Sequence, residues 1–175
     1  MEELILKAIA GDKDAFTLVI LEYEQELYKI AKMRLRSDYD ICEAIQNTMI
    51  LAYKHIKKVK EVKYFKTWII RILINECKKI YKRKKKESLI DDNNLLEIKD
   101  IKNEYENIEN ELTFNSLIEK LDYIEREIIV LYYNSGFSIK EIGKILHINE
   151  NTIKTKMRRA KIKLKNYMEG FDYYE

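Results

Sequence analysis

Apolar residues recur every three to four positions along most of this 175-residue chain. That is the period at which a helix turns one face toward a core. It predicts helices over 2–10, 12–35, 41–56, 64–86, 111–120 and 122–133, and two more between 138 and 165. The chain contains no proline and only four glycines, so little interrupts these helices. The pattern therefore predicts an all-α fold.

The last predicted helix has an apolar back and a basic front. Asn149 is suited to cap its start, because its side-chain oxygen can accept a backbone N–H of the first turn. The apolar stripe consists of Ile153, Met157, Ala160 and Leu164. The opposite side presents Asn151, Thr155, Arg158 and Arg159, flanked by Lys154, Lys156 and Lys161. Such a front suits the major groove of DNA, where Arg reads guanine and Asn reads adenine.

The helix before it and the connecting turn complete the pattern of a helix-turn-helix. The small shared core is expected to contain Ile139, Ile142 and Leu146. Gly143 has no side chain and lets the two helices approach closely. His147 stands where the turn requires a positive φ, which His tolerates better than most residues. An amphipathic hairpin with a merely solvated face is the alternative, but Gly143, the cap and the Arg158-Arg159 pair favour DNA binding.

The helix predicted over 64–86 has two contrasting faces. The aliphatic face is expected in the core and consists of Ile70, Leu73, Ile74, Cys77, Ile80 and Tyr81. The other face carries Trp68, Arg71, Ile72, Asn75 and Lys79, with Tyr64 and Phe65 just upstream. Aromatic rings and cations together suit single-stranded nucleic acid. Burial of Phe65 and Trp68 is the alternative, and for Trp68 it is favoured. The closing YKRKKK must face solvent or phosphate.

The helix predicted over 41–56 has apolar residues on both sides. Its core stripe consists of Ile41, Ala44, Ile45, Thr48, Ala52 and Ile56. The opposite side presents Glu43, Gln46, Asn47, Ile50, Tyr53 and Lys54. Ile50 and Tyr53 interrupt this polar face, which indicates either a larger core or a docking face for a protein partner.

Charge is strongly segregated along the chain. Residues 57–86 contain thirteen Lys and Arg against two acidic residues, a net charge of +11, and residues 138–167 have a net charge of +7 from nine against two. Between them, residues 87–111 have nine acidic residues against two Lys, a net charge of −7. Two basic modules predict a polyanion contacted at two places. Residues 87–110 are expected to be a flexible acidic linker.

Several classes of function are excluded by what the sequence lacks. It contains no run of eighteen apolar residues and no signal-peptide pattern, so a soluble, cytoplasmic protein without membrane insertion is expected. Cys42 and Cys77 lack the spacing of a metal or disulfide site, so two buried thiols, no metal and no cofactor are expected. No paired carboxylates, activated nucleophile or phosphate-binding loop appears, so the chain is not expected to be an enzyme.

Taken in order, these motifs resemble a bacterial RNA polymerase sigma factor of the sigma-70 family, in its two-domain extracytoplasmic-function (ECF) subgroup. GDKDAF and CEAIQNTM (residues 42–49) are similar to the segment that binds core polymerase. FKTWIIRI (residues 65–72) with Asn75 resembles the segment that opens the strands and reads the −10 element. LDYIEREIIVLYYN (residues 121–134) and residues 137–164 resemble the domain that reads the −35 element.

The resemblance implies a sigma factor that binds core RNA polymerase and directs initiation at promoter DNA, as duplex and as single strand. It implies a region 2-like domain over 1–86, the acidic linker over 87–110, and a region 4-like helix-turn-helix domain over 111–170. A dedicated anti-sigma factor is also implied as a partner.

The resemblance also implies three sets of site residues. Contacts to the −35 element fall on Asn151, Thr152, Lys154, Thr155, Lys156, Arg158 and Arg159. Contacts to the −10 element fall on Lys60, Lys63, Tyr64, Phe65, Lys66, Trp68, Arg71, Ile72, Asn75 and Lys79. Contacts to core polymerase fall on Glu43, Gln46, Asn47, Ile50 and Tyr53.

Three positions depart from the family pattern. Asn47 stands where an acidic residue is usual, so no salt bridge is assigned to it. Asp122 replaces a frequent proline, and both suit a helix start. His147 replaces the usual glycine of the turn.

Two other classes of function compete with the sigma factor. One is a conventional helix-turn-helix regulator with an N-terminal oligomerisation domain, which would bind duplex operators by itself, usually as a dimer. The other is a nucleic-acid-processing enzyme, which the missing catalytic residues disfavour. The aromatic and basic segment 64–86 distinguishes the sigma factor, since a duplex-only regulator has no use for it.

Overall fold

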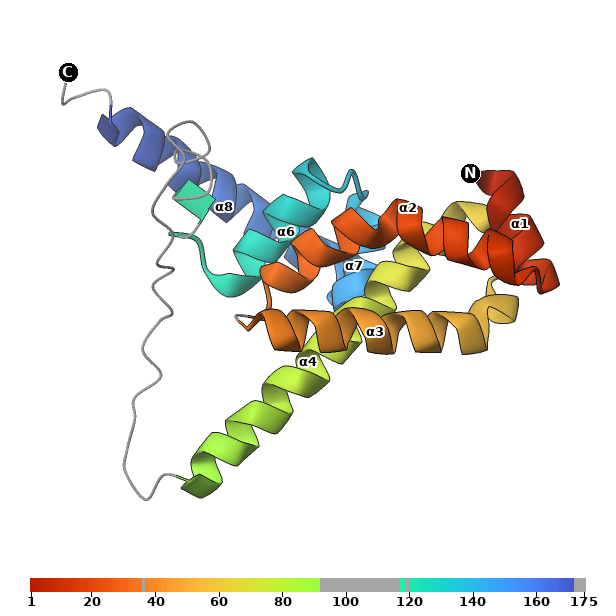
Figure 1. Cartoon of the computed structure of the whole chain (residues 1–175). Helices are drawn as coiled ribbons and strands as arrows, with labels where there is room; N and C mark the ends of the chain where they lie inside the picture. The colour runs from red at the N-terminus through yellow and green to blue at the C-terminus, as the bar shows by residue number, and fades with distance from the viewer. Residues whose placement is uncertain (36, 92–116, 119, 172–175) are drawn as a thin grey trace. The chain divides into compact units, whose positions relative to one another are not determined.

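A computed structural model describes residues 1–35, 37–91, 117–118 and 120–171 of the chain (Figure 1). The chain divides into two compact units, Met1–Leu95 and Leu96–Glu175. The described residues form helices joined by short turns and contain no strand. The prediction of an all-α fold is confirmed.

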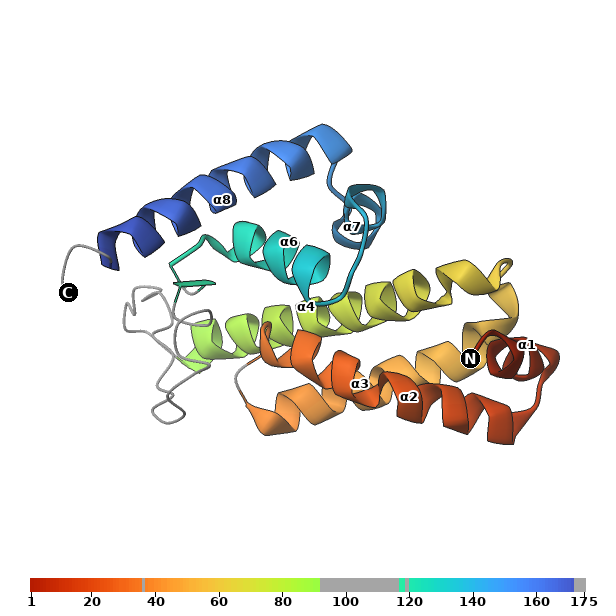
Figure 2. The same ribbon diagram turned by 90° about the horizontal axis from the view of Figure 1, so that it is seen from above.

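The described residues of the first unit form four α-helices. They are α1 (Glu2–Ala10), α2 (Lys13–Lys32), α3 (Asp38–His55) and α4 (Phe65–Asp91). Two single turns of 3₁₀-helix, η1 (Ile56–Lys58) and η2 (Val62–Tyr64), connect α3 to α4. Figures 1 and 2 show α2, α3 and α4 packed side by side, with α1 against α2. Their shared core contains the fully buried Leu27, Ile30, Ile41, Ile69, Ile70 and Leu73.

The ends of the first two helices follow the local sequence. Gly11 ends α1 in the left-handed conformation, with φ of 108°, where glycine carries no Cβ penalty. Asp12 then caps α2, since its Oδ1 accepts the backbone N–H of Ala15 at 2.9 Å. Both boundaries agree with the sequence prediction.

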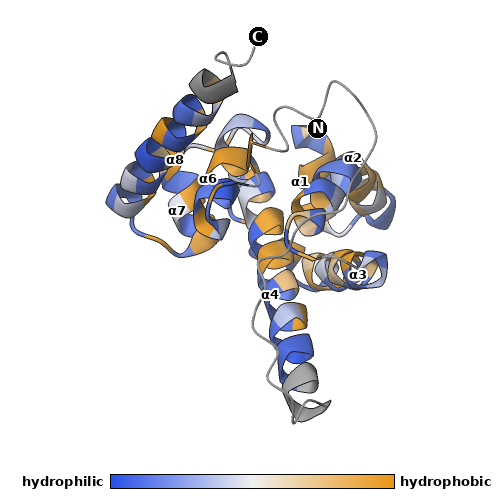
Figure 3. Cartoon of the chain, turned by 90° about the vertical axis from the view of Figure 1, so that its left-hand side faces the viewer, coloured by the Kyte–Doolittle hydropathy of each residue, from blue (hydrophilic) through white to orange (hydrophobic). Residues whose placement is uncertain are grey.

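Helix α4 was predicted to end at residue 86, but it continues through residues 87–91. The expected start of the linker at residue 87 is therefore wrong, and its remainder, 92–110, lies outside the described residues. The C-terminal part of α4 extends past α2 and α3 (Figures 1 and 3). Two ion pairs hold it to α3: Arg83 donates to both carboxylate oxygens of Glu43 at 2.8 and 2.7 Å, and Lys84 Nζ lies 2.6 Å from Asp40 Oδ2.

The second unit contains α6 (Tyr123–Tyr133), α7 (Ile139–Leu146) and α8 (Glu150–Phe171). Helix α8 packs against both α6 and α7, as Figure 2 shows. Their core contains Ile128, Leu131, Ile142, Ile145, Ile153 and Ala160. The helix expected over 111–120 falls mostly outside the described residues, although Leu117 and Ile118 are helical and buried. Helix α8 includes residues 170–171, and residues 172–175 are not described.

Several burial predictions need correction. Tyr81 was expected in the core but is 51% exposed, although the neighbouring Ile80 is buried. In α7, Ile145 is fully buried, whereas the expected core residues Ile139 and Leu146 are only half-buried. Cys77 is buried as expected, but Cys42 is exposed. Figure 3 shows the resulting distribution of hydropathy: apolar residues lie on the inner faces of the helices in each unit.

Candidate nucleic-acid interface

The turn between α7 and α8 is tight and closely packed. His147 ends α7 with φ of 59° and ψ of 41°, as the sequence predicted. The backbone N–H groups of His147 and Ile148 both donate to the Gly143 carbonyl oxygen, the second at 3.0 Å. A Cβ on Gly143 would lie only 2.9 Å from the Ile148 carbonyl oxygen. Gly143 therefore permits the close approach that the helix-turn-helix needs, and the contact is with the turn backbone.

Local hydrogen bonds fix the starts of both helices. Ser138 and Glu141 form a capping box, in which Ser138 Oγ accepts the Glu141 N–H at 3.3 Å and Glu141 Oε2 accepts the Ser138 N–H at 2.9 Å. At the second helix, Asn149 Oδ1 accepts the Asn151 N–H at 2.9 Å. The predicted cap at Asn149 is confirmed.

The predicted −35 residues share the outward side of α8. Asn151, Thr152, Lys154, Thr155, Arg158 and Arg159 are all exposed, opposite the buried Ile153, Met157 and Ala160. Lys156 differs from the rest because it is half-buried and its Nζ lies 3.7 Å from Asp122 Oδ2 on α6. Leu164, expected in the apolar stripe, is only half-buried. The structure thus brings six of the seven predicted side chains to one solvent-facing surface.

A second capping box starts α6, and one of its residues also contacts α8. Asp122 caps α6 by accepting the Glu125 N–H at 2.8 Å, and Glu125 reaches back to the Asp122 N–H at 3.4 Å. The buried Glu125 Oε2 also accepts from Lys163 Nζ at 2.7 Å. Burial opposes ionisation of Asp122, but the Glu125 N–H and the nearby Lys156 and Lys163 outweigh it, so the pKa of Asp122 is lowered. The ion pair between Glu125 on α6 and Lys163 on α8 fixes the rotation of α8 relative to α6.

Sequence reasoning missed Glu125 as a structural residue. The signal was present, since Asp122 and Glu125 have the three-residue spacing of a capping box. The contact with Lys163 could not be found in the same way, because the two residues are 38 positions apart.

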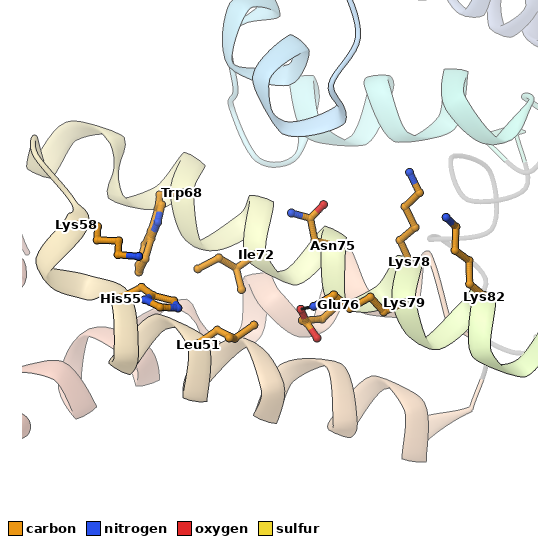
Figure 4. Close-up of a pocket in the computed structure, with 10 residues that line it drawn as sticks. All are labelled: Leu51, His55, Lys58, Trp68, Ile72, Asn75, Glu76, Lys78, Lys79 and Lys82. Atoms are coloured by element: carbon orange, nitrogen blue, oxygen red, sulfur yellow. Dashed lines mark hydrogen bonds and ion pairs between the residues drawn. The ribbon is translucent and has the colours of Figure 1, made fainter.

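In the first unit, α3 and α4 form an open groove of about 570 Å³ (Figure 4). Leu51 and His55 line it from α3, and Lys58 comes from η1. The α4 side consists of Trp68, Ile72, Asn75, Glu76, Lys78, Lys79 and Lys82. A half-buried aromatic ring beside several cations is the combination with which proteins hold unpaired bases. The groove therefore has the chemistry of a single-strand site.

The groove gathers only four of the ten predicted −10 residues, namely Trp68, Ile72, Asn75 and Lys79. Arg71 is exposed on the same helix. Lys60, Lys63 and Tyr64 are exposed in the connection before α4. There Lys63 Nζ lies 4.9 Å from the centre of the Tyr64 ring and 2.7 Å from Glu61 Oε2.

Two of the predicted −10 residues are turned away from the groove. Phe65 is fully buried, with its ring centre 5.6 Å from those of both Tyr23 and Trp68, so its expected stacking on a base is wrong. Lys66 points toward α2, where its Nζ lies 3.0 Å from Glu26 Oε1. Half a turn separates Lys66 from Trp68, which explains the difference. Trp68, for which burial was favoured, is half-buried and lines the groove.

Sequence reasoning also missed six residues of the groove: Leu51, His55, Lys58, Glu76, Lys78 and Lys82. The first three belong to α3 and η1, and no periodicity within α4 could have pointed to them. Lys78 and Lys82 were visible only as part of a run of positive charge.

The predicted polymerase-binding residues lie on α3. Ile50 and Tyr53 are 51% and 50% exposed, Gln46 is exposed and Asn47 is half-buried. The Tyr53 ring packs edge-on against Phe16 at 5.2 Å between ring centres. Glu43 is different, because its carboxylate is already paired with Arg83. Arg83 therefore holds the pKa of Glu43 below its usual range.

Within the described residues, no three His, Cys, Asp or Glu side chains are arranged to hold a metal ion. No described helix combines the length and the apolar character needed to cross a membrane.

Comparison with known protein families assigns both units. The family model for sigma-70 region 2 matches residues 19–87, and the model for sigma-70, region 4, matches residues 112–164. The first match covers the groove between α3 and α4, and the second covers the helix-turn-helix. The chain belongs to the sigma-70 family. It is a promoter-recognising transcription initiation factor. The sigma-70 family is a family of such factors and not of enzymes.

The relatives of this sigma-70 protein include several ECF RNA polymerase sigma factors. The ECF RNA polymerase sigma factor SigW of Bacillus subtilis is 28% identical, over 96% of this chain and 98% of that protein. The ECF RNA polymerase sigma factor SigM of Mycobacterium tuberculosis is 23% identical, over 93% of this chain and 81% of that protein.

Two solved structures have the same fold. One is the sigma factor RpoE of Bartonella quintana in complex with the anti-sigma factor NepR, with a TM-score of 0.71 and 23% identity, over 90% of this chain and 98% of that one. The other is CnrH in complex with the cytosolic domain of CnrY, with a TM-score of 0.66 and 21% identity, over 97% of both chains.

Proposed function

We propose that this chain binds core RNA polymerase and directs it to promoters by contacting the −10 element with its first unit and the −35 element with its second. The observation that carries the proposal is the order of two surfaces of different chemistry on one chain. A groove with an aromatic ring comes first, and a helix-turn-helix with a basic outward face follows. The sigma-70 family models match these two parts in the same order.

The groove between α3 and α4 is the proposed site for unpaired −10 bases. Trp68 supplies a ring for stacking, Asn75 supplies hydrogen-bonding groups, and Lys58 and Lys79 supply positive charge. A base that leaves the duplex loses a few kcal/mol of stacking and pairing, which contacts in the groove must offset. Tyr64, Arg71, Lys60 and Lys63 are proposed to contact the strand around the groove. Phe65 supports Trp68 from the core and Lys66 binds α2, so neither is proposed to contact DNA.

The outward side of α8 is the proposed −35 surface. Asn151, Thr152, Lys154, Thr155, Arg158 and Arg159 are exposed over the first three turns, the part of a recognition helix that enters the major groove. Arg158 and Arg159 suit guanine, and Asn151 suits adenine. Lys156 has a structural partner in Asp122 and is proposed to contribute mainly to the position of the helix.

The exposed side of α3 is the proposed surface for core polymerase. Gln46, Ile50 and Tyr53 combine polar and apolar groups in one exposed patch, and Asn47 lies half-buried beside them. An exposed apolar group on a polar face indicates a protein partner. Glu43 is proposed to act indirectly, by holding α4 against α3 through Arg83.

We also propose an anti-sigma factor as a partner, because RpoE and CnrH, which share this fold, were solved with such a factor and with CnrY respectively. The proposed site of action is the cytoplasm, where core polymerase and promoter DNA are found. The chain itself is proposed to perform no chemistry, which is left to the polymerase.

Two binding measurements test this proposal against the conventional regulator. The purified chain is first mixed with core RNA polymerase and the complex is isolated by pull-down. The isolated chain is then titrated with duplex promoter DNA. The proposal predicts a stable complex with core and weak binding to duplex DNA without core. No complex with core, together with tight binding of the isolated chain to duplex DNA, would establish the conventional regulator instead.

A further inference from the structure

Helix α2 carries a line of exposed side chains on the side that faces away from its core. Successive members are alternately four and three residues apart, the spacing of helices that pair with another helix. At about 100° of rotation per residue they fall within an arc of about 80°, roughly half a revolution from the buried Val19, Leu27 and Ile30. We call this line the outer stripe of α2, and it consists of Asp14, Leu18, Leu21, Gln25, Tyr28 and Lys32, all of them exposed.

The middle of the outer stripe contains apolar side chains where the outside of a helix is normally polar. Leu18 and Leu21 are 52% and 57% exposed, and Tyr28 is 38% exposed. A single exposed leucine is common on protein surfaces, but these three side chains share one line on one helix. None of them belongs to the surfaces proposed for DNA or for core polymerase. The proposed function therefore gives this line no role.

The two ends of the outer stripe carry opposite charges. Asp14 lies in the first turn of α2, whereas Lys29 and Lys32 lie in the last turn. Lys32 Nζ is 5.8 Å from the centre of the Tyr28 ring, which keeps its charge beside the stripe. Two copies of α2 that lay parallel would bring like charges together at both ends. Two antiparallel copies bring opposite charges together at both ends, so the charge pattern favours an antiparallel pair.

The spacing of the outer stripe is the same when it is read from either end. An antiparallel pair centred at the level of Tyr23 therefore places every member of the stripe opposite another member. Asp14 meets Lys32 of the second copy, Leu18 meets Tyr28, and Leu21 meets Gln25. Each of these contacts occurs twice, because a twofold interface uses the same surface on both copies.

From this arrangement we propose that the outer stripe binds a second copy of this chain, with the two α2 helices antiparallel. The interface is small, since it has three apolar side chains per copy and stable interfaces bury about 1,200–2,000 Å². Glu22 and Glu24 border the middle of the stripe, where each lies near its counterpart in the second copy and opposes pairing. The dimer is therefore weak and reversible.

Sedimentation velocity of the full chain, from micromolar to nearly millimolar concentration, measures this association. The wild type is expected to pass reversibly from monomer to dimer as its concentration rises. Leu18→Glu/Leu21→Glu is expected to remain a monomer throughout, because it places unpaired charges in the middle of the contact. Gln46→Glu/Ile50→Glu, which changes two exposed positions of α3, is the matched control and is expected to dimerise like the wild type. Thermal melting of each variant confirms its fold.

Charge reversal tests the antiparallel arrangement. Asp14→Lys and Lys32→Asp are each expected to weaken the dimer about tenfold, because each brings like charges together at both ends. An equimolar mixture of these two variants is expected to dimerise like the wild type, since opposite charges then meet again. Asp38→Lys is the matched control, an exposed acidic residue in the first turn of α3, and is expected to change little. Glu22→Gln/Glu24→Gln is expected to strengthen the dimer several-fold.

Three results would contradict the proposed dimer. A wild-type chain that stays monomeric at every concentration would overturn it and leave the outer stripe to a different protein. A dimer that persists in Leu18→Glu/Leu21→Glu would place the contact on another surface. A mixture of the two charge-reversal variants that associates no better than either variant alone would exclude the antiparallel pair. Core binding is measured separately by pull-down, so the proposed function stands or falls independently of these results.

Discussion

At the scale of single residues, Gly143 determines whether the turn of the helix-turn-helix can close. A methyl group there would lie 2.9 Å from the Ile148 carbonyl oxygen, and a backbone atom cannot move aside as the end of a flexible side chain can. Alanine improves helix propensity by at most about 1 kcal/mol, whereas overpacking costs about 1–3 kcal/mol. We expect Gly143→Ala to lower the free energy of unfolding of the second unit by about 1–2 kcal/mol. Denaturant titration measures this, with the exposed Lys140→Ala as a control that changes little. A Gly143→Ala protein as stable as the wild type would show that the turn can relax.

Arg158 and Arg159 are the residues that we expect to contribute most to base recognition by α8. Each is exposed on the outward side of the helix, and an arginine that pairs with guanine contributes about 1–3 kcal/mol of discrimination. We expect Arg158→Ala and Arg159→Ala holoenzymes to lose affinity by this amount and to relax the base preference at one position each. Selection of binding sites from a library with randomised −35 positions measures both effects.

Asn166→Ala is the matched control, because it lies on the same side of α8 about two turns farther on, beyond the part that enters the groove. Unchanged promoter choice in both arginine variants would show that another surface reads the −35 element.

Local features of single residues were largely predictable from the sequence. The caps at Asn149 and Asp122 and the left-handed His147 depend on neighbours within a few positions, and all three agree with the structure. Phe65 was not predictable in this way. Its burial depends on Tyr23, a residue of another helix 42 positions earlier in the chain.

At the scale of elements, the exposed side of α3 is expected to decide polymerase binding. Replacing Gln46 and Ile50 by Glu places two charges in a patch that is otherwise neutral and partly apolar, and unpaired charges are costly in an interface. We expect Gln46→Glu/Ile50→Glu to abolish association with core polymerase and to leave the fold intact, because both side chains are exposed. Pull-down with core polymerase measures the association.

Leu18→Glu/Leu21→Glu is the matched control for this variant, since these two leucines are 52% and 57% exposed on α2. It is expected to bind core like the wild type. Wild-type affinity in the α3 variant would show that the docking surface lies elsewhere.

Helix α6 supplies a test that depends on pH. The pKa of Asp122 is lowered in the folded protein, so its charge stabilises the fold above the unfolded pKa near 3.8 and ceases to do so as the pH falls through the lower, folded value. Asp122→Asn keeps an acceptor for the Glu125 N–H but removes the charge. We expect it to be less stable than the wild type by about 0.3–1 kcal/mol at pH 7, and equally stable once the pH is below the folded pKa. Asp122→Ala loses the cap as well as the charge and is expected to be less stable than Asp122→Asn by about 1 kcal/mol at either pH. A wild-type advantage over Asp122→Asn that does not change with pH would contradict the electrostatic account.

Helices were easier to predict than their surroundings. The apolar period gave α1 to α4 and α6 to α8 with boundaries mostly within a few residues. It could not show which side chains of α4 another helix covers or where α4 ends, so Tyr81 was placed in the core and the five helical residues after Lys86 were assigned to the linker. Which cations of α4 are neutralised also depends on α3, and no pattern within one helix reveals that.

At the scale of the whole molecule, the two segments proposed to contact DNA were recognised in the sequence, but the groove that the first of them forms with α3 and η1 was not. It forms where α3, η1 and α4 meet, and its residues run from Leu51 to Lys82. The segregation of charge was a more reliable guide, because it does not depend on tertiary contacts. It pointed to two basic modules, and each contains one of the proposed DNA surfaces.

The central claim is that this chain makes core polymerase initiate at specific promoters, and run-off transcription measures it most directly. Core RNA polymerase is incubated with genomic promoter fragments in the presence and absence of the chain, and the transcripts are mapped. The account predicts discrete start sites that depend on the chain and share one −10 and one −35 element. Transcripts that do not change when the chain is added, or start sites without a common upstream element, would contradict it.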